Sequence, residues 1–149
     1  ASATPQDAYL NAYLGWFDFS QQDNEATQFG LEYRFKPWQY GLRPTIGANI
    51  TTDGSLYGYG GLNWDLPLID NKLYLVPNFM AGAYDQGSSG KDLGHGIEFR
   101  SGIELDYQLQ NTDRVGIAFN HISNASLGDH NPGAETVLIN YSIHVGNLF

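Results

Sequence analysis

Apolar and polar residues alternate along much of this chain. Successive side chains of a β-strand point to opposite faces of a sheet, so a period of two predicts strands with one apolar face. The clearest example is 40–51, where alternate positions from Tyr40 read Tyr, Leu, Pro, Ile, Ala and Ile and the positions between are small or polar. Eight segments show this kind of pattern: 9–19, 28–36, 40–51, 56–64, 73–83, 97–108, 114–123 and 136–145.

The lengths of these segments and of their connectors indicate a membrane β-barrel. Most segments have about nine to twelve residues, which is the length a tilted strand needs to cross a bilayer. The connectors alternate between short turns (36–39, 110–113) and longer segments rich in Gly, Asp, Asn and Ser (86–94, 124–134). We therefore predict an all-β chain, one domain over residues 1–149, folded as an eight-stranded antiparallel transmembrane β-barrel. Phe149, after an amphipathic last strand, resembles the ending of such barrels.

Composition agrees with this fold and excludes some partners. Charged residues make up 15% of the chain, against about 25% in a typical soluble domain. A barrel wall needs an apolar residue only at every second position, so a mean hydropathy of -0.34 is compatible with it. The net charge of -9 argues against nucleic acid as a partner, and the absence of Cys excludes disulfides and thiolate metal sites. The small residues Ala1-Ser2-Ala3 fit a chain that follows a signal-peptide cleavage site.

The alternation alone does not show whether the apolar faces point outward into lipid or inward into the barrel. A soluble eight-stranded barrel that binds a ligand inside would show the same alternation, with the apolar face turned inward. Two features favour the membrane barrel: the apolar faces lack charge, and Trp16, Trp38 and Trp64 lie near predicted strand ends, as interface anchors do. Pro44 and Pro77 each remove a ladder hydrogen bond, so we expect bulges or bends there.

With the apolar faces outward, the charged faces would line the lumen. An eight-stranded barrel has little more interior space than its own side chains fill. We therefore expect a structural salt-bridge network and no pore. Its predicted members are Glu32, Arg34, Arg43, Glu98, Arg100, Glu104, Asp106 and Arg114.

Three polar residues break the outer apolar faces of the last two predicted strands. His121 and Ser123 share the face of Val115, and Glu135 shares the face of Val137 on the next strand. A polar side chain that faces lipid is costly unless it is paired or functional. A hydroxyl, an imidazole and a carboxylate are also the parts of a nucleophile, a base and the group that orients the base. A structural role at a wet strand end is the alternative, and Asp129 and His130 are rival acid and base residues in the intervening loop.

The sequence around these residues resembles a known family. His121-Ile122-Ser123-Asn124-Ala125, followed by Glu135, is similar in residue type and spacing to the PagL-type outer-membrane lipid A 3-O-deacylases. The resemblance extends mainly over 115–149. It departs from the family at Ile122, where Tyr is frequent, and at Ser126, where Gly is frequent.

The resemblance implies an eight-stranded barrel with a Ser–His–Glu triad on its lipid-facing wall, in the bacterial outer membrane and toward the outer leaflet. Ser123 would then be the nucleophile, His121 the base and Glu135 its orienting carboxylate, with Asn124 and Ala125 as oxyanion donors. The expected substrate is lipopolysaccharide, whose lipid A would lose an ester-linked 3-hydroxyacyl chain. No cofactor or metal is expected. Lys91 is a candidate contact for lipid A phosphates, the surrounding membrane lipids are expected partners, and the apolar wall allows a homodimer.

Two other functions remain open from the sequence. A small barrel that mediates adhesion or protects the surface would not cleave esters and would tolerate Ser123→Ala. A barrel acyltransferase would hold an acyl chain in an apolar lumen, and the charged inner faces argue against it.

Overall fold

A computed structural model of the chain contains nine β-strands among the residues that it describes. The structure describes residues 7–17, 26–69, 72–85, 87, 96–124 and 133–145. The strands are β1 (Tyr9–Phe17), β2 (Ala26–Arg34), β3 (Leu42–Thr51), β4 (Leu56–Trp64), β5 (Leu66–Ile69), β6 (Leu73–Asp85), β7 (Ile97–Gln108), β8 (Arg114–Ser123) and β9 (Ala134–His144). A short 3₁₀ helix, η1 (Gln39–Gly41), precedes β3.

Within the described ranges, no helix is both long enough and apolar enough to cross a bilayer.

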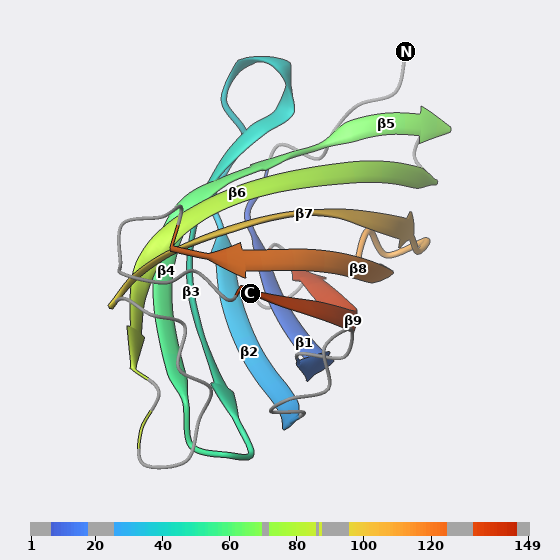
Figure 1. Ribbon diagram of the computed structural model, residues 1–149. Helices are drawn as coiled ribbons and strands as arrows, with labels where there is room; N and C mark the ends of the chain where they lie inside the picture. Colours follow the sequence, from blue (N-terminus) through green and yellow to red (C-terminus); the bar gives the residue numbers. More distant parts are fainter. Residues whose placement is uncertain are drawn as a thin grey trace.

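The strands close into one antiparallel barrel (Figure 1). Their order is β4-β3-β2-β1-β9-β8-β7-β6-β5, and β4 also pairs with β6. Only Asp65 separates β4 from β5, and both pair with β6, so together they form one strand of the barrel. The prediction of an eight-stranded antiparallel barrel is therefore confirmed. Closure removes the exposed sheet edges that would otherwise lie open to other chains.

The two prolines behave differently from each other. Pairing between β4 and β6 ends at Asn63 opposite Asn78 and resumes with β5 at Leu66 opposite Leu75, so the ladder is interrupted at Pro77, as expected. The bulge or bend expected at Pro44 is wrong, because the pairing of β3 with β4 runs through it without a shift. Pro44 lies just beyond the last β2–β3 pair, where its missing N–H interrupts nothing.

The strand predicted to begin at Tyr40 begins at Leu42 instead. Tyr40 has a φ of 65° and Gly41 a φ of 82°, and this left-handed backbone cannot continue a strand. A Cβ at Gly41 would lie 2.6 Å from the carbonyl oxygen of Asp65, so the close approach of the neighbouring backbone requires glycine. The turn predicted over 36–39 therefore extends to Gly41.

Large apolar side chains cover the outside of the barrel. Ile117 and Ile139, near the middle of β8 and β9, are each 59% exposed. The eight charged residues expected in the lumen are all buried, with Arg43 and Asp106 at 0% exposure. This orientation rejects the soluble barrel with an apolar interior. It is the arrangement of a membrane barrel, whose wall faces hydrocarbon.

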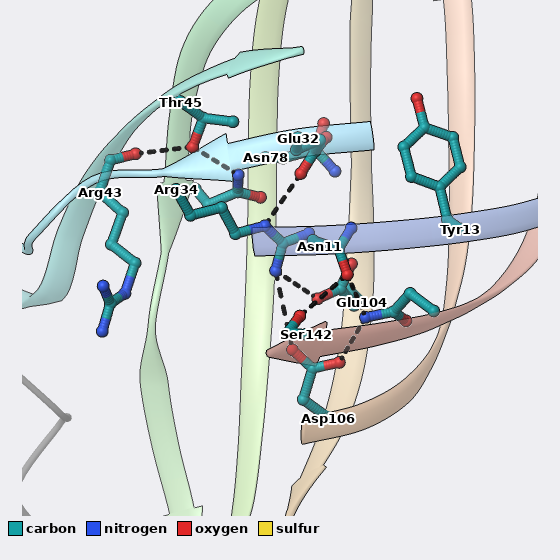
Figure 2. A network of polar contacts seen from close by, with 12 residues as sticks. Asn11, Tyr13, Glu32, Arg34, Arg43, Thr45, Asn78, Glu104, Asp106 and Ser142 are labelled. Atoms are coloured by element: carbon teal, nitrogen blue, oxygen red, sulfur yellow. Dashed lines mark hydrogen bonds and ion pairs between the residues drawn. The ribbon is translucent and has the colours of Figure 1, made fainter. Parts of the chain in front are cut away.

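Ion pairs fill the lumen as predicted. Arg34 donates two hydrogen bonds to the carboxylate of Glu104, at 2.7 and 2.9 Å, and a third from Nε to Glu32 at 2.9 Å. The other oxygen of Glu32 accepts a hydrogen bond from Arg100 Nη2 at 2.8 Å. Figure 2 shows Arg34 lying between Glu32 and Glu104. These contacts compensate the charges of Glu32, Arg34, Arg100 and Glu104, which a low-dielectric interior requires.

A second ion-pair cluster lies at the break between β4 and β5. Asp65 Oδ2 accepts hydrogen bonds from Arg43 Nε at 2.8 Å and from Arg114 Nη1 at 3.0 Å. The guanidinium of Arg114 also lies 3.9 Å from the centroid of the Tyr74 ring. The alternation of this strand turns the Asp65 carboxylate inward like Asn63, and at the break it pairs with two arginines.

An apolar cluster lies in the lumen near the end of β8 and the start of β9. The buried side chains there form a cluster of Phe17, Tyr57, Tyr59, Met80, Ile122 and Ala134. Ile122 and Ala134 belong to the strand segments that carry the candidate site residues, so this cluster anchors those segments from inside. A small cavity beside it, lined by Tyr57 and Arg100 among others, has a volume of about 10 Å³, which is roughly the space of one water.

Candidate active site

The alternation of β8 and β9 sets the direction of the candidate residues. Ile122 points into the lumen and is 7% exposed, so its neighbours His121 and Ser123 point outward. On β9, Ala134 and Thr136 are buried and Glu135 between them points outward. His121 lies directly opposite Glu135 in the β8–β9 register. The structure therefore brings all three residues to one patch of the outer wall.

His121 and Glu135 form a hydrogen bond across the two strands. The Nδ1–H of His121 donates to Glu135 Oε2, with 2.6 Å between the two atoms. The side chain of His121 is 46% exposed and that of Glu135 is 21% exposed. A carboxylate that accepts from Nδ1 holds the ring in one tautomer and leaves Nε2 as the basic nitrogen. The pair has the geometry of a general base with its orienting group.

Ser123 is the last residue of β8 and is half-buried. It lies two positions from His121 on the same face, so the two Cα atoms are about 6.5–7 Å apart. Within the described part of the chain, Ser123 makes no hydrogen bond to His121. Catalytic hydrogen bonds in substrate-free enzymes are often long and tighten when substrate binds. The spacing would allow Ser123 and His121 to act as nucleophile and base, although no hydrogen bond joins them in this structure.

Gly133 is a site residue that the sequence analysis missed. It is buried immediately before β9 and has a φ of +64°. A Cβ built on it would lie 3.0 Å from His121 Cε1 and 3.5 Å from His121 Nε2. The backbone at Gly133 therefore limits the position of the ring on the edge that carries Nε2. The combination Asn131-Pro132-Gly133 in the sequence is typical of turns and could have indicated a special backbone conformation at Gly133.

Asn124 follows Ser123 and has no exposed surface. The other loop residues named from the sequence lie outside the described residues: Ala125, Ser126, Asp129 and His130, together with Lys91 and Phe149 elsewhere. The described residues contain no group of three or more His, Asp or Glu side chains arranged to hold a metal ion.

An apolar surface lies beside the three polar residues, toward the middle of the barrel. Phe119 and Val137 lie opposite each other on the outer face, two residues along β8 and β9 from His121 and Glu135. They line a shallow hollow of about 190 Å³, together with Leu75, Ile103, Leu105 and Ile117. The three polar residues thus adjoin a wall that suits a hydrocarbon chain.

The chain is similar in sequence to a known family over most of its length. The family model described as Lipid A 3-O-deacylase (PagL) matches residues 8–144. Lipid A deacylase PagL of Bordetella bronchiseptica is 33% identical over 110 residues, which cover 68% of this chain and 61% of that protein. The matched part of this chain thus spans less than two thirds of that relative's length.

Solved structures agree on the fold. The crystal structure of the outer membrane enzyme PagL superposes with a TM-score of 0.66 at 21% identity, covering 91% of this chain and 98% of that one. A structure described as de novo design of transmembrane β-barrels gives the same TM-score of 0.66 at 9% identity, covering 96% of this chain and all of the other. Because the designed barrel fits equally well, these likenesses speak for the barrel architecture alone.

Proposed function

The chain belongs to the lipid A 3-O-deacylase (PagL) family, and from that membership we propose that it is a serine esterase that removes an ester-linked 3-hydroxyacyl chain from lipid A. The barrel is an outer-membrane barrel by family and fold. The observation that carries the proposal is the hydrogen bond between His121 Nδ1 and Glu135 Oε2 on the outer wall, on the same face as Ser123. A triad in that position meets a lipid ester without removing the lipid from the membrane.

In the proposed mechanism, Ser123 Oγ attacks the ester carbonyl while His121 Nε2 accepts the hydroxyl proton. Glu135 holds the ring and stabilises its charged form. The tetrahedral intermediate collapses when His121 returns the proton to the leaving sugar oxygen, which gives an acyl-enzyme and a free sugar hydroxyl. Water, activated by His121, then hydrolyses the acyl-enzyme and releases the 3-hydroxy fatty acid.

Asn124 and Ala125 are the proposed oxyanion donors. The backbone amide of Asn124 is the first after the nucleophile, and the complete burial of this residue supports a fixed position for it. A donor that is held in place before the reaction needs no reorganisation when the oxyanion forms. Loss of one such donor lowers the rate by about 10²–10³ in characterised hydrolases.

The apolar hollow below the triad is the proposed path of the acyl chain. Phe119 and Val137 would contact the methylene groups next to the ester, on a wall that already faces hydrocarbon. We also propose that this end of the barrel lies in the outer leaflet. Both termini would then be on the periplasmic side, with the loop that joins β8 and β9 at the cell surface.

Lipopolysaccharide incubated with the purified protein in detergent tests the proposal. Mass spectrometry of the lipid A should show the loss of one 3-hydroxyacyl chain with the wild type, and no loss with Ser123→Ala or His121→Ala. Each variant is first checked for the folded barrel by its migration on an unheated gel. Lipid A that is unchanged by folded wild-type protein would falsify the deacylase and favour an adhesive or protective barrel. Transfer of an acyl chain to lipid A would identify an acyltransferase.

A further inference from the structure

Ser101 is a polar residue on the otherwise apolar outer face of β7. It is exposed on β7, and its neighbours on the same face of that strand are Phe99 and Ile103. Across the β6–β7 pair it lies opposite Phe79. The rings of Phe79 and Phe99 stack with their centroids 6.1 Å apart and their planes at 19°. The hydroxyl therefore has aromatic or aliphatic neighbours along β7 and on β6.

The fourth neighbour of Ser101 is the proposed base. Ser101 lies directly opposite His121 in the β7–β8 register, and His121 lies opposite Glu135 in the β8–β9 register. Ser123 lies opposite Phe99, so Ser101 and Ser123 are diagonal neighbours. Side chains in that relationship are about 7–8 Å apart, a gap that a small part of a substrate can fill.

The lipid-facing position makes this hydroxyl costly. Transfer of a hydroxyl from water to an apolar medium costs free energy unless the hydroxyl finds a hydrogen-bond partner. Among the described residues, Ser101 has no such partner. Its position beside His121 and diagonal to Ser123 leaves the hydroxyl available to a substrate of the proposed reaction.

The position of the apolar hollow shows which part of the substrate comes near. Ile103 and Phe119 line the hollow. They lie opposite each other on the outer face, two residues along β7 and β8 from Ser101 and His121. An acyl chain that starts at Ser123 and enters the hollow along the β7 side of His121 passes Ser101 within its first few carbons. In a 3-hydroxyacyl chain, the second carbon beyond the carbonyl carries a hydroxyl.

We propose that Ser101 hydrogen-bonds the 3-hydroxyl of the acyl chain that is removed and so selects 3-hydroxyacyl esters over unsubstituted ones. This inference rests on the proposed deacylase function. The contact would form beside the reacting carbonyl, so it would affect which ester is cleaved and leave the proton transfers at His121 unchanged.

The test compares two synthetic glucosamine esters of equal chain length, one with a 3-hydroxyacyl chain and one with the unsubstituted chain, in detergent micelles. The kcat/KM ratio for the two esters is measured in the wild type, Ser101→Ala and Ser101→Thr. Thr27→Val serves as the matched control, because it removes an exposed hydroxyl of the outer wall from the distant strand β2. Ser123→Ala gives the background rate.

The wild type and Thr27→Val should prefer the 3-hydroxyacyl ester. Ser101→Ala should lose that preference by about 3- to 10-fold, the effect of one uncharged hydrogen bond, with little change for the unsubstituted ester. Ser101→Thr, which keeps the hydroxyl, should restore most of the preference. An equal loss on both esters, or no loss on either, would overturn the role of Ser101 and leave the esterase standing. If the wild type cleaves neither ester above the Ser123→Ala background, the proposed function fails and this inference fails with it.

Discussion

His121 and Glu135 face each other across the β8–β9 ladder, with 2.6 Å between His121 Nδ1 and Glu135 Oε2. The carboxylate is 21% exposed on the outer wall of the barrel, where it would adjoin lipid. A partly desolvated carboxylate in contact with an imidazole is an effective orienting group, because little water competes for the hydrogen bond. This pair is the part of the candidate site that depends least on the loop between the two strands.

Replacing the carboxylate by an amide tests this contact. Glu135→Gln keeps the shape of the side chain but lets its amide group donate to the imidazole, which favours the wrong tautomer. We expect kcat for lipid A deacylation to fall by about 10²- to 10⁴-fold, as for orienting carboxylates in other triads. Mass spectrometry of lipid A at early time points measures the rate.

Asp85→Asn is the matched control, since it makes the same chemical change at the exposed end of β6. It should leave the rate unchanged, and both variants should migrate as folded barrels. A Glu135→Gln variant as fast as wild type would show that this carboxylate does not orient His121.

The part of the site that could be predicted is the part set by local alternation. A strand with its apolar face outward also turns His121 and Ser123 outward, whatever its partners are. The same rule places Glu135 on the outer face of the next strand. It does not decide which outward residue of β9 lies opposite His121, since a slip of two positions keeps every face. The observed register settles that question.

The features that escaped prediction depend on contacts between distant segments. Gly133 is constrained by the imidazole of His121, and Gly41 by the carbonyl of Asp65. The separate strand β5 reflects the interruption of pairing with β6 around Pro77, between Asn63 and Leu66. A pattern read along one segment carries no record of such neighbours, so turns and strand breaks were placed less well than faces.

Gly133→Ala should disturb the candidate base. The new methyl group would lie 3.0 Å from His121 Cε1, at a residue whose φ of +64° already disfavours a side chain. We expect a fall of roughly tenfold or more in deacylation rate, from displacement of the ring, and a stability loss of about 1 kcal/mol from backbone strain. Gly58→Ala is the control, because a Cβ there meets nothing within 4 Å. Equal rates for the two variants would mean that the ring has room to move.

Ile117→Lys tests the outward direction of the apolar face. Ile117 is 59% exposed near the middle of β8, so a charge there would lie deep in hydrocarbon. We expect the free energy of unfolding from phospholipid vesicles to fall by about 2–4 kcal/mol. Tyr40→Lys, in the turn before β3 and 83% exposed, should cost at most about 1 kcal/mol. Similar values for both would contradict a lipid-facing wall at Ile117.

Arg34→Met tests the ion-pair network of the lumen. Arg34 is 4% exposed and donates two hydrogen bonds to Glu104, so its loss leaves that buried carboxylate without its arginine partner, while Glu32 keeps Arg100. Urea unfolding in vesicles should show a loss of about 3–5 kcal/mol. The double variant with Glu104→Gln removes that charge, keeps the Glu32–Arg100 pair and should recover part of the loss. If the double variant is less stable than Arg34→Met, other groups stabilise the Glu104 carboxylate and Arg34 is not its essential partner.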